Sequence, residues 1–239
     1  MKKIIAVTAA LMMASLSAFA LDITVGARGN FNMGLGSTLC DDEDNVKVNP
    51  IIGGGFGVYG NFGLLELVGG SLGVQPEINM NFNNGVNAEY KYSDGGDSYE
   101  ETGKYTDITV DIPVLVTFTY PVMEALSIGG GFGPYISIPF GCDYTYKVKS
   151  TYGGVSSTSE QTGSDDYEMK ANLNFGLAFA VNGAYKVGPG SIALDIRYML
   201  DLTPTKVASK LKSGGSWSDY DEKFYRRMLT IGVGYQIKF

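Results

Sequence analysis

The amino-acid sequence predicts an all-β protein, a transmembrane antiparallel up-and-down β-barrel of about eight strands that follows a cleaved signal peptide. The clearest observation is the final run, Met228–Phe239, in which apolar residues alternate with small or polar ones. Side chains of a strand point alternately to opposite faces, so this run has one wholly apolar face. Second, 44% of the chain is hydrophobic, yet no run after the N-terminus approaches the ~20 apolar residues of a spanning helix. Alternating strands in a closed barrel are the other way to cross a membrane.

The N-terminal segment is typical of a secretory signal peptide. Lys2 and Lys3 precede an apolar run that ends at about Leu16, and Ala18-Phe19-Ala20 supplies a small-residue cleavage site. The alternative is a membrane-anchoring helix, which the shortness of the apolar run disfavours. We therefore assign residues 1–20 to a signal peptide and residues 21–239 to one outer-membrane β-barrel domain.

The first half of the mature chain contains four alternating runs. Each has apolar residues on one face and mostly Gly, Asn, Thr or charged residues on the other, which is the pattern of a strand between two different environments. The four predicted strands, with examples of their apolar faces, are Asp22–Leu35 (Ile23, Val25, Phe31), Ile51–Asn61 (Ile52, Phe56, Val58), Leu65–Phe82 (Leu72, Val74, Ile78) and Asp107–Tyr120 (Ile108, Val110, Ile112).

The second half repeats the pattern four times. Pro134 and Pro139 fall in or near the fifth strand and predict bulges or weak pairing there, because proline cannot donate to a strand ladder. The predicted strands are Leu126–Tyr146 (Ile128, Phe132, Ile136), Met169–Tyr185 (Leu173, Phe175, Leu177), Ile192–Leu202 (Leu194, Ile196, Tyr198) and Met228–Phe239 (Leu229, Ile231, Val233).

The connections between these strands alternate between short and long. Short turns are predicted near Gly63, Pro121 and Pro189, and long polar loops near Asp42, Gly95, Gly154 and Gly214. With an even number of strands, both termini lie at the end of the barrel that has the short turns. We expect the termini to be periplasmic and the four long loops to be extracellular. The last strand should pair with the strand that begins at Asp22.

A soluble lipocalin-like barrel has similar alternation, but its apolar face points inward around a ligand. Two observations favour the membrane barrel. The polar faces are rich in Gly, Asn and Thr rather than in the Lys and Glu of a solvated exterior. Aromatic residues also gather near the strand ends, as in the girdles of membrane barrels. They are Phe62, Tyr120, Tyr185, Tyr235 and Phe239 at one end, and Phe31, Phe82, Phe140, Tyr144, Phe224 and Tyr225 at the other.

The chain resembles the small outer-membrane β-barrel families, of the OmpA-transmembrane/OmpX-like and PorT-like kinds. The resemblance rests on the overall pattern, on the terminal Tyr235-Gln236-Ile237-Lys238-Phe239, and on fragments such as Asp111-Ile112-Pro113-Val114 and Gly133-Pro134-Tyr135-Ile136. It implies the outer membrane of a diderm bacterium, a monomer surrounded by outer-membrane lipid, and periplasmic chaperones and the barrel assembly machinery as partners. It also implies that Tyr235, Ile237 and Phe239 form an assembly signal; the alternative is that they are girdle aromatics and strand residues only.

Charged residues on the polar faces are predicted to point into the barrel. In a narrow barrel such charges neutralise one another and fill the lumen, because an unpaired buried charge is costly. The alternative is a carboxylate pair that performs acid–base catalysis, since the chain has no histidine. The predicted lumen network comprises Arg28, Glu77, Asp107, Asp111, Lys170, Asp195, Arg197, Asp201 and Arg226. We predict no catalytic, cofactor-binding or metal-binding residues.

Two cysteines, Cys40 and Cys142, are predicted on the same side of the barrel. Export is oxidising, so the sequence leaves open both a disulfide and two separate thiols. Neither their spacing nor the ligand set suits a metal site. Glycine clusters such as Gly53-Gly54-Gly55 do not open a helix, so they do not predict a nucleotide site. The acidic segment Asp41–Asp44 is interpreted as a solvated loop, with a surface cation site as the alternative.

Composition separates the remaining function classes. Removal of Lys2 and Lys3 changes the formal charge from −7 to −9, which argues against binding to nucleic acid. Our leading interpretation is a non-enzymatic barrel that presents four surface loops in a structural, adhesion or surface-interaction role. A small channel or transporter for ions or hydrophobic solutes is the second interpretation, and a soluble periplasmic ligand-binding barrel is the third.

Overall fold

The computed structural model describes residues 22–35, 37–38, 46–163, 173–213 and 216–239. In these ranges the chain is built of β-strands and turns, and no helix among them is long and apolar enough to cross a membrane. The strands are β1 (Asp22–Gly34), β2 (Ser37–Thr38), β3 (Val46–Asn49), β4 (Ile51–Leu67), β5 (Gly70–Asp94), β6 (Asp97–Met123), β7 (Leu126–Tyr152), β8 (Val155–Gly163), β9 (Asn174–Val187), β10 (Gly190–Asp201), β11 (Thr205–Ser213), β12 (Ser216–Tyr225) and β13 (Arg227–Lys238). The predicted signal peptide lies outside the described residues.

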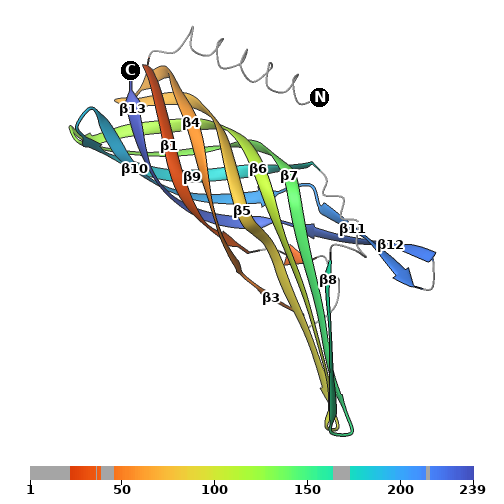
Figure 1. Cartoon of the computed structure of the whole chain (residues 1–239). Coiled ribbons are helices and arrows are strands. Elements are labelled where there is room, and N and C mark those ends of the chain that lie inside the picture. Colours follow the sequence, from red (N-terminus) through yellow and green to blue (C-terminus); the bar gives the residue numbers. More distant parts are fainter. Residues whose placement is uncertain (1–21, 36, 39–45, 164–172, 214–215) are drawn as a thin grey trace.

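The barrel is a closed antiparallel sheet (Figure 1). Its wall runs β1–β4–β5–β6–β7–β9–β10–β13 and returns to β1, which confirms the predicted barrel of eight strands. The closing pair runs from Thr24 opposite Lys238 to Gly34 opposite Met228. The final strand therefore pairs with the first, as its alternation predicts.

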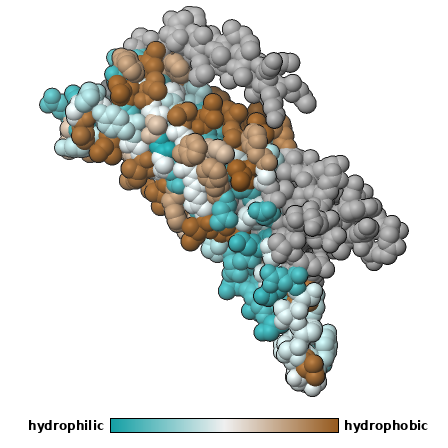
Figure 2. Space-filling view, viewed as in Figure 1, coloured by the Kyte–Doolittle hydropathy of each residue, from teal (hydrophilic) through white to brown (hydrophobic). Residues whose placement is uncertain are grey.

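The apolar faces of these strands point outward. Val25 is 50% exposed and Phe132 is 60% exposed, whereas the polar residues of the opposite faces are buried inside. Figure 2 shows the resulting apolar surface over the barrel. This arrangement is the reverse of a soluble ligand-binding barrel and excludes the lipocalin-like interpretation.

Short turns join the strands at the end of the barrel that holds Asp22 and Phe239, here called the turn end. They lie at Val68–Gly69, Glu124–Ala125 and Gly188–Pro189. The first of them corrects our prediction, because β4 continues past Gly63 and the next strand begins at Gly70 rather than Leu65. Val68 and Gly69 have φ of 51° and 78°. A positive φ is unfavourable for a β-branched residue such as valine, so the sequence does not indicate a turn at this position.

The other end of the barrel, the hairpin end, also differs from prediction. Two of the expected loops are strands: β5 and β6 continue to a turn at Gly95–Gly96, and β7 continues to Gly153–Gly154 and returns as β8. A third expected loop is the β11–β12 hairpin. Polar residues with Thr, Tyr and Val in alternation form strands readily, so polarity alone misidentified them as loops. The loop expected near Asp42 lies outside the described residues.

The extended parts of β5, β6 and β7, together with β3 and β8, form one sheet that projects from the barrel (Figure 1). We call it the protruding sheet; it consists of β3, β8 and residues 84–94 of β5, 97–107 of β6 and 141–152 of β7, in the order β3–β5–β6–β7–β8. Register shifts mark its junction with the barrel, between Phe82 and Asn84 and between Ile108 and Thr109. The second shift lies opposite Pro139, where a bulge was predicted.

Candidate functional site

The charged residues predicted to fill the lumen do point inward. They come from β1, β5, β6 and β10 and from the residue before β13, and each is at most 7% exposed: Arg28, Glu77, Asp107, Asp111, Asp195, Arg197, Asp201 and Arg226. Lys170 lies outside the described residues. Glycines flank Arg28 and leave room for its side chain. Gly57 and Gly234 are the register neighbours of Arg28, and a Cβ on Gly234 would lie 2.8 Å from that of Arg28.

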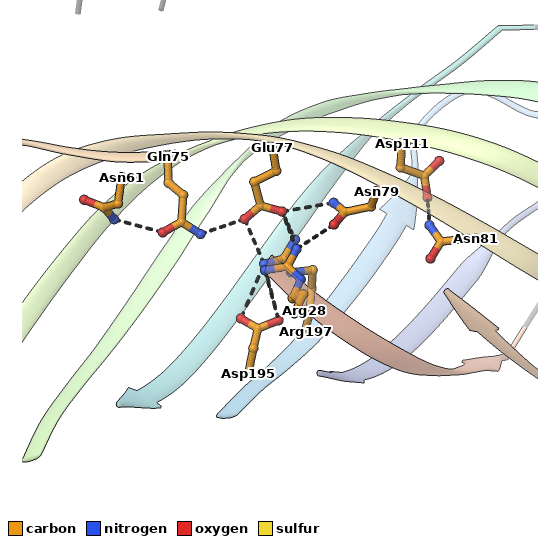
Figure 3. Close-up of polar contacts among 9 residues, drawn as sticks. All are labelled: Arg28, Asn61, Gln75, Glu77, Asn79, Asn81, Asp111, Asp195 and Arg197. Atoms are coloured by element: carbon orange, nitrogen blue, oxygen red, sulfur yellow. Dashed lines mark hydrogen bonds and ion pairs between the residues drawn. The ribbon is translucent and has the colours of Figure 1, made fainter. Parts of the chain in front are cut away.

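Two arginines and two acidic residues form a central cluster (Figure 3), defined as Arg28, Glu77, Asp195 and Arg197. Arg28 Nη2 lies 2.5 Å from Glu77 Oε2. Arg197 donates to both oxygens of Glu77, with 3.0 Å between Nη2 and Oε1. Asp195 lies 3.3 Å from Arg197 Nη2 and 3.8 Å from Arg28 Nη1. The cluster is formally neutral, which is what makes burial of four charges tolerable.

Amide side chains complete the hydrogen bonding around Glu77. Gln75 donates to Oε1 at 2.7 Å and Asn79 to Oε2 at 3.0 Å. Asn61 extends the chain to Gln75 and Thr117, at 2.9 Å in each case. Gln75 and Asn79 lie on the inward face predicted from the alternation of β5, but their part in the network was not predicted.

A second group of charges, the hairpin-end cluster, is defined by Arg226, Asp111 and Asp201. Arg226 Nη2 lies 3.1 Å from Asp111 and 3.7 Å from Asp201. Asn81 donates to Asp111 at 2.7 Å, and the Tyr135 hydroxyl donates to Asp201. Asp107 is buried on the same side of β6, but no ion pair within 4 Å joins it to a described residue. This cluster therefore carries more carboxylates than arginines.

A buried apolar group, here called the apolar layer, lies between the two clusters on the side of the lumen formed by β6, β7, β9, β10 and β13. Along β10 the inward residues are Asp195, Arg197, Met199 and Asp201 in succession, so Met199 lies between them. It belongs to a buried group with Leu115, Tyr135, Ala178, Ala180 and Met228. Our prediction missed this layer because inward positions were identified by their polarity. The period of two in β6 and β10, taken without regard to residue type, places Leu115 and Met199 inside.

At the turn end the lumen holds a cavity of about 700 Å³, which is bounded at its inner end by Arg28, Tyr59 and Asp195. The Tyr59 ring lies 5.3 Å from the Arg28 guanidinium, and its hydroxyl donates to Gln236 at 2.8 Å. Beyond the cavity, the central cluster, the apolar layer and the hairpin-end cluster occupy the interior.

This arrangement can neutralise and hold charge, and it leaves its carboxylates poorly placed for acid–base chemistry. Asp195 is the buried carboxylate that borders the cavity, and two guanidiniums engage it. A general base must be free to approach the proton that it abstracts from a substrate. No group of three or more metal-ligating side chains is found in the ranges that the structure describes.

The residues of the predicted assembly signal lie on the outer surface of the barrel. Tyr235, Ile237 and Phe239 point outward near the turn end, with Phe239 77% exposed and its backbone N–H donating to Ile23 at 2.8 Å. Their role as an assembly signal stays a prediction. Of the two cysteines, Cys142 is paired with Asp107 in the backbone register. Cys40 lies outside the described residues, so the disulfide also stays a prediction.

Comparison with known proteins places this geometry in a structural class. No family model and no curated protein matches the chain. The outer membrane protein OprG from Pseudomonas aeruginosa is 14% identical over 91% of this chain and 96% of its own, with a TM-score of 0.52. AlkL is 14% identical over 91% and 90%, with a TM-score of 0.42, and Neisserial surface protein A is 12% identical over 91% and 97%, with a TM-score of 0.37. The closed eight-stranded wall and the likeness to OprG show that the chain has the fold of the small outer-membrane β-barrels.

Proposed function

We propose that the protein is a non-enzymatic integral barrel of the outer membrane, which holds the protruding sheet outside the cell as an interaction surface. The observation that carries this proposal is the continuity of β5, β6 and β7 from the barrel wall into that sheet. A surface built from uninterrupted strands is stiffer than loops and loses less conformational entropy when it binds. In this arrangement the turn end and both termini are periplasmic.

The filled interior supports a scaffold rather than a pore. About eight strands enclose little more than their own side chains, and the charged clusters and the apolar layer use that space. The cavity at the turn end is the one observation that favours the second candidate, a gated channel for ions or hydrophobic solutes. Such a channel would have to break the central cluster in order to open.

Protease accessibility in whole cells tests the proposal. A recognition sequence for a specific protease is inserted between Gly95 and Gly96 in one variant, and between Gly188 and Pro189 in another, both exposed turns. We expect added protease to cut the first in intact cells and the second only after the outer membrane is permeabilised. The reverse pattern, or no membrane association on cell fractionation, contradicts the proposal.

A further inference from the structure

The strand register sorts the protruding sheet into two faces of opposite character. Tyr90 is opposite Glu101, which is opposite Val148, so these residues share a face and their sequence neighbours share the other. Among the residues whose side chains the structure describes, the first face, the tyrosine face, contains Val48, Ala88, Tyr90, Tyr92, Asp94, Asp97, Tyr99, Glu101, Gly103, Tyr105, Val148, Ser150, Tyr152, Val155, Ser157 and Ser159. No lysine or arginine occurs at these positions.

The opposite face, the lysine face, carries the basic residues of the sheet. Lys47, Lys91, Lys104, Lys147 and Lys149 share it with Glu89, Glu100 and Glu160. Lys91 lies 2.5 Å from Glu89 and 3.5 Å from Glu100, and Lys147 lies 3.5 Å from Glu160. The hydrogen bond from Lys91 lowers the pKa of Glu89, and the same bond raises the pKa of Lys91. The carboxylates of this face therefore have lysine partners from the same face.

The carboxylates of the tyrosine face have no lysine or arginine partner among the described residues. Glu101 accepts a hydrogen bond of 2.9 Å from the Tyr99 hydroxyl, and Asp97 accepts one of 3.0 Å from the Gly153 backbone. Tyr99 in turn packs edge-on against Tyr90, with ring centroids 6.2 Å apart. This surface combines aromatic rings with negative charge that no cation of the described chain neutralises.

The direction of the tyrosine face can be read from β6, because the extra residues at the two register shifts, Asn83 and Phe140, lie on β5 and β7. On β6 the residues of the tyrosine face continue the inward series Asp111, Thr109 and Asp107, so this face follows the lumen side of the barrel wall. Tyr105, at the base of the face, is 4% exposed, whereas Tyr92, farther out, is 52% exposed. The face is therefore directed over the mouth of the barrel and not toward lipid, and a ligand would approach it from water.

We propose that the tyrosine face binds a cationic polypeptide segment rich in arginine or lysine, an inference that rests on the proposed extracellular position of the sheet. Arginine side chains stack on tyrosine rings and pair with carboxylates in the same contact. The mature chain carries a formal charge of −9 after loss of Lys2 and Lys3, which steers such a segment toward the protein. The lysine face repels it.

The test uses the full-length mature protein in neutral detergent micelles and a fluorescein-labelled hexa-arginine peptide, with hexa-glutamate as the control peptide. Fluorescence anisotropy gives the Kd. The double variant Tyr90→Ser/Tyr99→Ser removes the ring pair, and Glu101→Gln removes the carboxylate. The matched control, Glu89→Gln/Glu100→Gln, removes two carboxylates from the lysine face. Tyr92→Ser, at an exposed ring, replaces the double variant should that not fold.

We expect hexa-arginine to bind and hexa-glutamate not to bind. The double tyrosine variant should raise the Kd about tenfold, from the loss of two cation–π contacts at half-buried rings, and Glu101→Gln about threefold. The matched control should leave the Kd within about twofold. The proposal is overturned if the wild-type protein does not bind hexa-arginine, or if the control weakens binding as much as the tyrosine variants do. Such a failure leaves the protease-accessibility result unaffected, so it is distinguishable from failure of the proposed function.

Discussion

Glu77 is the residue on which the central cluster depends. Its two oxygens accept hydrogen bonds from Arg28, Arg197, Gln75 and Asn79. It is 2% exposed, so water cannot replace these partners. Without its charge, the arginines would retain only Asp195 as a counter-ion in the cluster, and a buried guanidinium cannot escape by losing its proton.

We predict that Glu77→Gln destabilises the barrel by about 3 kcal/mol, the usual cost of breaking a buried ion pair on one side. Urea titration of the protein in detergent, followed by circular dichroism, measures the free energy of unfolding. Glu66→Gln, at an exposed position near the turn end, is the control and should change it by less than about 0.5 kcal/mol. Equal stability of Glu77→Gln and wild type would show that the network is not structural.

The charged members of the lumen could be predicted from sequence because they alternate with apolar residues. Arg197, for example, follows Ile196 and precedes Tyr198 in an unbroken strand pattern. The partners could not be predicted, since which inward side chains meet depends on how strands far apart in the chain are staggered around the barrel. Tyr135 was missed for a further reason: an aromatic residue inside the lumen looks the same in sequence as one of the girdle.

At the scale of the elements, the turn between β4 and β5 places a β-branched residue, Val68, in a left-handed backbone conformation that is unfavourable for it. Val68 is 92% exposed and has a φ of 51°, so no packing offsets the cost of its left-handed conformation. Asn83 shows the opposite case. Its φ is 55°, which asparagine tolerates, and its side-chain amide donates to the Ile52 carbonyl at 2.7 Å across the register shift.

We predict that Val68→Asn stabilises the barrel by about 1 kcal/mol, because Asn-Gly is the preferred pair for a two-residue hairpin turn with positive φ. The same urea titration measures the gain. Val68→Ala is the matched control; it keeps a Cβ and should gain less than the asparagine variant. A loss of stability in Val68→Asn would contradict the assignment of strain to this turn.

The strand pattern predicted the barrel wall well and the region beyond it poorly. Alternation is reliable where lipid on one side and the lumen on the other demand different residues. At Asn83 and Phe140 the phase of alternation shifts. In its proposed position outside the cell, the protruding sheet has no lipid on either side to impose a difference between its faces. Its tyrosine and lysine faces become visible only after the register is known.

At the scale of the whole molecule, the C-terminus can be tested separately from the fold. We predict that Phe239→Ala lowers the amount of folded protein in the outer membrane, whereas the purified variant refolds in detergent as the wild type does. The Phe239 backbone bond to Ile23 persists in the variant. Tyr185→Ala removes another exposed aromatic residue of the turn end and should not lower the amount. If both variants assemble normally, Phe239 is a girdle residue only.

The barrel, in our central proposal, is closed by its own side chains and acts through the sheet it carries. Planar-bilayer recording of the wild-type protein tests this most directly, with insertion verified by protection of the barrel from protease in vesicles of the same lipid. We predict no sustained single-channel current, because the central cluster, the apolar layer and the hairpin-end cluster fill the lumen. A stable unitary current from the inserted wild-type protein would contradict the proposal and favour the channel.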